Sequence, residues 1–252
     1  MNYINKYSWK SFLSTATREV HEENGFYWFK TRKNWQLLKE RDLVESDLDF
    51  IGKLLPVNFF YFSLSDISIL KQKYKVDKNK DPDIAINLEQ FSLRGNKYKD
   101  IRNYVNRYNN KFEIVDNYKN MEDIYKMIAR WDDTSGDKYY QVRTGKNKYY
   151  FLNNLHKGCI NVFIYDGEKL ISFAVLSPAD DGGYSSYIIG KALCIDYPGL
   201  SEYTDVEVYK RAIAEGVKVV NLGGGGRKLV AYKKKFPGSF TNDTYDGQIY
   251  VI

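Results

Sequence analysis

The sequence predicts a mixed α+β protein, and three observations carry this prediction. The chain has 252 residues, which suits one large domain or two small ones. Hydrophobic residues at 43% and charged residues at 28% are typical of globular proteins and exclude disorder along the whole chain. Strand patterns and helix patterns alternate along the chain, with neither type dominating.

The N-terminal part is expected to begin with helices, because its first 55 residues are rich in aromatic and charged side chains. An amphipathic pattern predicts a helix over 31–43, and a Ser-Asp-Leu-Asp sequence predicts a helix start at 46–49. An apolar run after Pro56 predicts a buried strand at 57–63. The next expected elements are a short helix at 66–74, a charged surface loop at 75–81 and a strand at 83–93.

From Gly95 onward the pattern becomes regular. Apolar residues from Tyr98 to Tyr108 recur at spacings of three and four, which predicts a helix. The expected elements after it are a strand at 112–115, helices at 121–131 and 146–155, strands at 160–165, 170–176 and 184–189, a helix at 201–214, a strand at 217–222, a helix at 229–235 and a strand region at 239–251. This is the element order of the Gcn5-related N-acetyltransferase (GNAT) fold.

Short motifs carry a closer resemblance. They are GNKYKDIRNYVNRY at 95–108, YPGL at 197–200 followed by VVNLG at 219–223, and AYKKKFP at 231–237. In this order they resemble the family named for the C-terminal domain of phosphatidylglycerol lysyltransferase, which is related to Fem-type peptidyltransferases. The resemblance spans residues 84–252 and implies a tandem GNAT-like acyltransferase fold. Its two halves would be residues 1–110 and 111–252, with a cleft between them.

The resemblance implies transfer of an aminoacyl or acyl group to an amine or hydroxyl of a lipid, peptidoglycan or small-molecule acceptor. In the characterised relatives the donor is aminoacyl-tRNA. A first alternative is an N-acetyltransferase that uses acyl-CoA, although residues 190–199 lack the glycine-rich turn that normally holds the CoA pyrophosphate. A second alternative is a non-catalytic module that binds an anion or RNA on a degenerate GNAT fold. It arises because no histidine or cysteine stands in a pattern typical of a catalytic residue.

Three residues are the candidates for catalysis. The resemblance favours Lys233, whose ammonium could stabilise a donor phosphate or a developing oxyanion, together with Tyr232 before it. The alternative for the lysine run is a solvated basic surface. Asp205 is the preferred general base among three carboxylates of the 201–214 helix, the others being Glu202 and Glu207.

Donor-binding candidates come from two stretches. Arg102, Asn103, Asn106 and Arg107 lie on the 98–108 helix, where they suit recognition of a phosphate or carboxylate or, alternatively, packing between halves. The second stretch surrounds four consecutive glycines, which suit a loop close to a phosphate or simply a flexible connection. Its candidates are Asn221, Gly223, Gly224, Arg227 and Lys235.

Charge and composition limit the kinds of partner and cofactor that we expect. The net charge of +6 and pI near 8.9 suit tRNA, an anionic lipid or another phosphate-bearing substrate, or reflect only a composition rich in lysine. Two cysteines and two histidines show no metal-ligand spacing, so we expect no metal and no permanently bound cofactor, with aminoacyl-tRNA or acyl-CoA as co-substrate. The sequence shows no signal peptide or membrane-spanning segment. This predicts a cytoplasmic protein, with a peripheral position at the membrane as the alternative.

Overall fold

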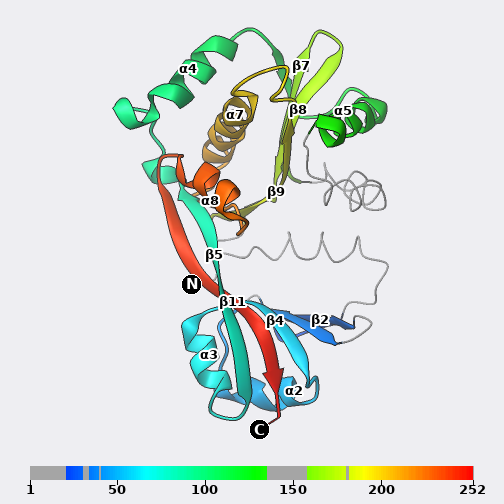
Figure 1. Cartoon of the computed structure of the whole chain (residues 1–252), viewed down its shortest axis with the longest axis vertical. Helices are drawn as coiled ribbons and strands as arrows, with labels where there is room; N and C mark the ends of the chain where they lie inside the picture. Colours follow the sequence, from blue (N-terminus) through cyan, green and yellow to red (C-terminus); the bar gives the residue numbers. More distant parts are fainter. Residues whose placement is uncertain (1–20, 31–33, 40, 135–157, 180–181, 252) are drawn as a thin grey trace.

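The computed structural model describes residues 21–30, 34–39, 41–134, 158–179 and 182–251, and they form two lobes (Figure 1). The lower lobe holds β1 (His21–Glu23), β2 (Phe26–Lys30), β3 (Trp35–Lys39), η1 (Glu45–Asp47), α2 (Leu48–Gly52), β4 (Val57–Phe62) and α3 (Leu64–Leu70). The upper lobe holds η2 (Leu88–Gln90), η3 (Asn96–Tyr98), α4 (Lys99–Tyr108), β6 (Glu113–Val115), α5 (Met121–Thr134), β7 (Ile160–Asp166), β8 (Lys169–Leu176), β9 (Tyr184–Ala192), α7 (Leu200–Ala214), β10 (Val219–Asn221) and α8 (Arg227–Lys234).

Two long strands, β5 (Lys75–Asn87) and β11 (Ser239–Tyr250), join the lobes (Figure 1). They pair antiparallel with each other from Ser239↔Ile86 to Tyr250↔Lys75. β11 also pairs with β4 of the lower lobe, and β5 pairs with β10 of the upper lobe. The described strands therefore form one mixed sheet, in the order β1-β2-β3-β4-β11-β5-β10-β9-β8-β7-β6. Within it β11, the C-terminal strand of the described residues, lies between β4 and β5 of the N-terminal part.

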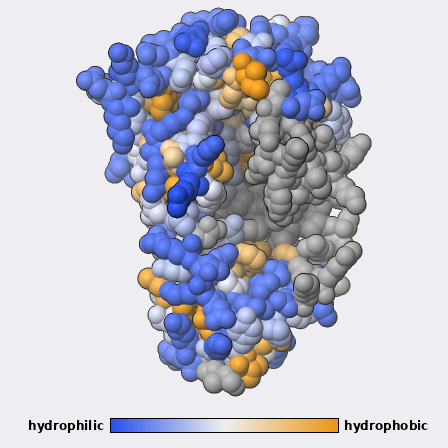
Figure 2. Space-filling view, in the orientation of Figure 1, coloured by the Kyte–Doolittle hydropathy of each residue, from blue (hydrophilic) through white to orange (hydrophobic). Residues whose placement is uncertain are grey.

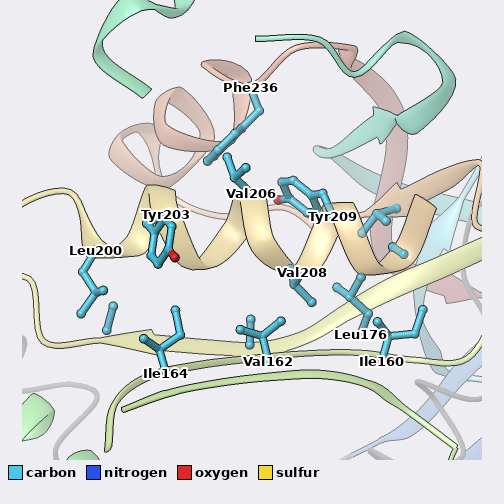
Figure 3. Packing of buried hydrophobic residues seen from close by; sticks show 14 of the residues in the cluster. Ile160, Val162, Ile164, Leu176, Leu200, Tyr203, Val206, Val208, Tyr209 and Phe236 are labelled. Carbon is cyan, nitrogen blue, oxygen red and sulfur yellow. The ribbon is translucent and has the colours of Figure 1, made fainter. Parts of the chain in front are cut away.

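Helix α7 is the centre of the upper lobe. Leu200 and Val208 face the strands, while Val206 and Tyr209 point toward Phe236 on the opposite side (Figure 3). A helix with apolar side chains on several faces must be covered on several faces. The sheet covers α7 on one side, while α4 and the segment that ends at Phe236 cover it on others. Because α7 is covered on several sides, polar side chains such as Thr204 and Asp205 are buried along with the apolar ones.

The second face of the upper sheet packs against α5. Ile124, Met127 and Ile128 of this helix join a cluster with Phe163 and Phe173 of the strands. The lower lobe has its own core, in which α2 and α3 pack against β3 and β4. Its largest buried side chains include Phe26, Phe59 and Phe62. Each lobe therefore has its own hydrophobic core, although the two lobes share one sheet.

The expected mixed α+β fold is confirmed, and most of the expected elements from 46 onward are present. Several expectations are wrong, and two of them concern whole segments. Residues 35–39 form strand β3 and not part of a helix, because β2 and β4 pair with both of its edges. Residues 75–81 form the start of β5 and not a loop, because β11 supplies a partner strand along its whole length.

Smaller differences concern the ends of elements. The expected strand at 83–93 ends at Asn87, where η2 begins. The expectation of helices in the first 55 residues fails at β1 and β2, which are strands, and residues 1–20 lie outside the described part. The helix expected at 146–155 also lies outside it. The division into halves at residue 110 stays a prediction, as does a cleft between them.

Candidate functional site

The structure places the carboxylate of Asp205 between two tyrosines. Tyr187 Oη donates to Asp205 Oδ1 at 2.6 Å, and Tyr232 Oη donates to Asp205 Oδ2 at 2.6 Å. Asp205 itself is only 6% exposed. The three side chains come from β9, α7 and α8, so the hydrogen bonds join three elements at one point. Hydrogen bonds to an ionised group are the stronger kind and define its orientation.

A glycine makes room for one of these tyrosines. A Cβ atom at Gly190 would lie 2.0 Å from Tyr187 Oη, so any larger residue at 190 would displace the phenol. Because Tyr187 and Gly190 belong to the same strand, the sequence of β9 itself creates the space in which Tyr187 reaches Asp205.

Burial controls protonation at this site. Loss of solvation raises the pKa of Asp205 to about 6, and hydrogen bonds from the two phenols limit that rise. Burial and the nearby Asp205 charge raise the pKa of Tyr187 and of Tyr232 well above 10. The phenols thus stay protonated at neutral pH. A carboxylate whose pKa lies near the working pH can accept and return a proton.

An ion pair lies on the outer side of these residues. Lys235 Nζ bonds Glu202 Oε1, and the same ammonium lies 3.9 Å from the ring centroid of Tyr232. The side chains of Lys235 and Glu202 are 32% and 16% exposed, so they lead from the buried carboxylate toward solvent. We call Tyr187, Glu202, Asp205, Tyr232 and Lys235 the Asp205 cluster.

The glycine-rich loop after β10 is held by two polar side chains. Lys233 Nζ donates to the carbonyl oxygens of Leu222, Gly223 and Gly224 at 2.5, 2.9 and 2.5 Å. Asn221 Oδ1 accepts a hydrogen bond from Gly223 N at 2.7 Å. The loop is thereby fixed from α8 on one side and from the end of β10 on the other.

The other side of this loop is open. A Cβ atom at Gly223 or Gly226 would meet nothing within 4 Å, and Gly223 has a φ of 69°, which favours glycine. Asn221 also donates to the buried Asp83 Oδ2 at 3.1 Å, which ties the loop to β5. The arrangement presents ordered backbone to any ligand that reaches the open side. Arg227 follows the loop and is exposed.

The structure therefore separates the expected site residues into three groups. Asp205, Tyr232 and Lys235 come together, while Lys233, Asn221, Gly223 and Gly224 form the ordered loop beside them. The three protons of an ammonium match the three carbonyls that Lys233 contacts. Lys233 thus acts on the loop directly, and its expected role at an oxyanion stays a prediction.

The α4 residues form the third group. Arg102 Nη1 donates to the carbonyl oxygens of Leu93 and Gly95, each at 2.5 Å, and so closes the turn before the helix. Asn103, Asn106 and Arg107 are exposed on the outer side of α4. These residues are a separate surface and not part of the Asp205 cluster.

Sequence reasoning missed Tyr187, which contributes as much to the cluster as Tyr232 does. The spacing gave no signal, because positions 187 and 190 of a regular strand face opposite sides of the sheet. A β-bulge between Tyr187 and Ile189 brings Tyr187 and Gly190 to the same face. The partner of Tyr187 on α7 could not be inferred without the strand order. Glu202, a candidate base or a stabilising charge in the first turn of the helix by sequence, pairs with Lys235 in the structure.

Two further tests concern ligands and membranes. Within the described ranges, no group of three His, Cys, Asp or Glu side chains is placed to hold a metal ion. Over the same residues, no helix combines the length and the apolar character needed to cross a membrane.

The mixed sheet and its covering helices define a GNAT-like fold. The family described as phosphatidylglycerol lysyltransferase, C-terminal, matches residues 56–230, and the chain belongs to this family. Family and fold together point to acyltransferase activity. No curated protein matches the chain.

Solved structures support the fold. The C-terminal domain of a protein described as a lysylphosphatidylglycerol synthetase from Agrobacterium fabrum is 14% identical, with a TM-score of 0.66 over 96% of this chain and 86% of that one. FemX is 11% identical, with a TM-score of 0.63 over 97% and 91%. A GCN5-related N-acetyltransferase from Kribbella flavida is 10% identical, with a TM-score of 0.53 over 97% and 94%. At these identities the likeness concerns the fold alone.

Proposed function

We propose that this chain transfers an aminoacyl group from aminoacyl-tRNA to an amine or hydroxyl of an acceptor. The observation that carries the proposal is the buried Asp205 carboxylate, with its pKa near 6 and its two phenol donors. Acyl transfer to an amine or hydroxyl needs a group that removes a proton from the nucleophile. Asp205 suits that task at neutral pH.

The proposed reaction balances without a metal or a redox partner. The acceptor nitrogen or oxygen attacks the ester carbonyl of the donor, a new C–N or C–O bond forms, and the ester bond to the ribose oxygen breaks. The nucleophile's proton passes through Tyr232 Oη to Asp205, since Asp205 is too buried to meet the acceptor itself. A proton then returns to the ribose oxygen as it leaves. Lys235 lies beside Tyr232, where its charge stabilises the oxyanion that forms.

The environment of the α7 N-terminus supports this donor over acyl-CoA. A GNAT that uses CoA holds the pyrophosphate on backbone N–H groups at this helix start. Here a Cβ atom at Gly199 would lie 2.1 Å from the Tyr104 ring, so α4 packs directly on the helix start. Tyr108 Oη also donates to the Pro198 carbonyl oxygen at 2.8 Å. A pyrophosphate would have to displace these aromatic contacts.

The family suggests which acceptor to test first. It is named for phosphatidylglycerol lysyltransferase, so an anionic lipid is the first acceptor to test, ahead of peptidoglycan and small amines. On this proposal the chain works in the cytoplasm, where aminoacyl-tRNA is made, and a lipid acceptor would bring it to the membrane surface.

The decisive experiment compares donors with one acceptor set. The purified chain is incubated with labelled lysyl-tRNA, alanyl-tRNA or acetyl-CoA and with phosphatidylglycerol vesicles or soluble amines, and the labelled product is measured. We expect transfer from an aminoacyl-tRNA, and Asp205→Asn should lower turnover by about 10²–10⁴-fold. Glu207→Gln is the matched control, because Glu207 lies on the same helix but pairs with Lys210.

Two results would contradict the proposal. Transfer from acetyl-CoA alone would establish the acyl-CoA alternative. Binding of tRNA or anionic lipid without transfer from any donor would favour a non-catalytic module.

A further inference from the structure

Positive charge is dense in two segments of this chain. Residues 94–111 contain six basic side chains and a single acidic one, Asp100, and residues 218–235 contain six basic side chains and no acidic one, whereas the whole chain has a net charge of +6. In the second segment, Lys233 bonds loop carbonyls and Lys235 pairs with Glu202. The basic residues of 94–111 are Arg94, Lys97, Lys99, Arg102, Arg107 and Lys111.

Part of this charge faces solvent along one side of α4, and the rest is exposed just before and just after the helix. Ile101 and Tyr108 of the helix are buried with α7, while Lys99, Asn103 and Arg107 are exposed at spacings of four residues. Figure 2 shows a hydrophilic surface at the upper left, where α4 lies in Figure 1. We call Lys97, Lys99, Asn103, Asn106, Arg107 and Lys111 the outer face of α4.

The cations of this face differ from several exposed lysines elsewhere in the described part of the chain. Lys73, Lys80 and Lys119 each pair with an Asp or Glu, although other exposed lysines such as Lys53 and Lys71 have no such pair among the described side chains. None of the ion pairs between described side chains includes a cation of the outer face. Lys97 and Arg107 instead lie over the rings of neighbouring tyrosines, at 5.4 and 5.6 Å from the centroids. Their charge is available to a partner.

We infer that the outer face of α4 binds the sugar–phosphate backbone of RNA. The inference rests on the proposed function, since it assigns a surface to the RNA body of the donor. Cations bind phosphates, and Asn side chains hydrogen-bond to phosphate and sugar oxygens, which together make up most contacts to a nucleic-acid backbone. Asn103 and Asn106 are exposed on the same helix as Lys99 and Arg107.

A membrane surface fits this face less well. Helices that lie on membranes insert an apolar face between the lipid headgroups. The apolar side of α4 packs against α7, and its exposed side carries charged and amide groups with the half-buried rings of Tyr98 and Tyr104 beneath two of the cations. Binding of an RNA sugar–phosphate backbone accounts for both kinds of group, because cations bind the phosphates and amides bond to phosphate and sugar oxygens.

The test measures binding of deacylated tRNA to the full chain by fluorescence anisotropy at several salt concentrations. In the variant Lys99→Gln/Arg107→Gln/Lys111→Gln we expect at least a tenfold loss of affinity and a salt dependence reduced by about two to three in the slope of log K against log salt. The control is Lys53→Gln/Lys71→Gln/Lys75→Gln, which removes the same charge from exposed positions of the lower lobe. The control should keep the wild-type affinity.

Equal binding by variant and wild type would overturn the inference, and so would an equal loss in the control. Binding of wild-type protein to anionic vesicles but not to tRNA would also overturn it, in favour of a membrane surface. Transfer is measured separately, with a short 3′-aminoacyl oligonucleotide that lacks the RNA body. The variant should use this short donor as well as wild type does. If neither protein transfers from any donor, the proposed function fails while the binding result still decides the role of α4.

Discussion

Asp66 in the lower lobe and Asp205 in the upper lobe are both buried carboxylates, but only Asp66 contacts a buried cation. Lys39 Nζ lies 2.7 Å from Asp66 Oδ2, and the two side chains are 0% and 1% exposed. Asp66 also accepts from Leu43 N at 2.8 Å and Ser63 N at 2.6 Å. Asp205 accepts from two neutral phenols, with its nearest ammonium bonded to Glu202 instead.

The difference separates a structural carboxylate from a reactive one. Asp66 pairs with a buried lysine and accepts from two backbone N–H groups, so it fixes β3, the loop after it and the start of α3. Asp205 has donors that can themselves exchange protons and neighbours that reach the surface. The upper lobe thus keeps its carboxylate in a state that chemistry can use.

The largest effect is expected from breaking the lower pair. Lys39→Met keeps the apolar stem but leaves Asp66 buried without its cation, so the free energy of unfolding should fall by about 3–5 kcal/mol. Urea unfolding measures this change. The double variant Lys39→Met/Asp66→Asn removes both charges and should recover part of the loss. A decrease below about 1 kcal/mol in the single variant would mean that the pair is not structural.

A pH dependence should distinguish Asp205 from Asp66. Folding raises the pKa of Asp205 from 3.8 to about 6, so the folded state binds this proton more tightly than the unfolded state does. The contribution of Asp205 to stability is therefore present at low pH and is lost as pH rises from about 4 to 6, by roughly 3 kcal/mol. Asp205→Asn removes this dependence. The difference in unfolding free energy between variant and wild type, measured from pH 4 to 7, should change by this amount, and a constant difference would contradict the assignment.

The two phenols should be alike in stability but different in turnover. Tyr187→Phe and Tyr232→Phe each remove one hydrogen bond to a charged group, which should lower the unfolding free energy by about 1.5–3 kcal/mol. Both should raise the pKa of Asp205, so the midpoint of the pH–rate profile should move above 6. Only Tyr232→Phe should also lower kcat at high pH, because the proton passes through its hydroxyl. Equal kcat values for the two variants would remove Tyr232 from the proton path.

The smallest effect is expected at the lysine run. Lys233→Met releases three loop carbonyls and should lower kcat/KM about tenfold through displacement of the loop, while Lys234→Met, at an exposed neighbour, should be nearly neutral. A thermal melt confirms that both variants fold. A decrease of about 10²–10³-fold in Lys233→Met would instead support direct stabilisation of an oxyanion. A strong effect of Lys234→Met alone would show that the roles are assigned to the wrong lysine.

Much of the fold could be predicted because local pattern and final environment agree. The apolar run of β4 and the spacing of Ile101 and Tyr108 in α4 carry their own periodicity. A strand at residues 75–81 could not be predicted from local pattern, because these residues are mostly charged. They form a strand because they pair with β11, which lies far along the chain. Strand β3 failed for a similar reason. Its buried Gln36 and Lys39 look like the polar face of a helix until Asp66 and the partner strands are in place.

The candidate site was predictable residue by residue but not as a constellation. Asp205 and Tyr232 could each be chosen, one for its place on a helix and one through the family motif. Their hydrogen bond depends on how α8 crosses α7, which the sequence does not encode locally. Lys233 shows the reverse case, since the motif singled it out but the loop carbonyls receive its ammonium.

The position of β11 in the sheet also determines when the lower lobe can finish folding during translation. β11 lies between β4 and β5, yet it is translated after the whole upper lobe. Until it emerges, the growing chain carries a lower lobe with two unpaired strand edges, a state that invites wrong pairing with other chains. Ribosome-bound chains that stop before residue 239 should therefore depend on chaperones, and release of the last strand should end that dependence.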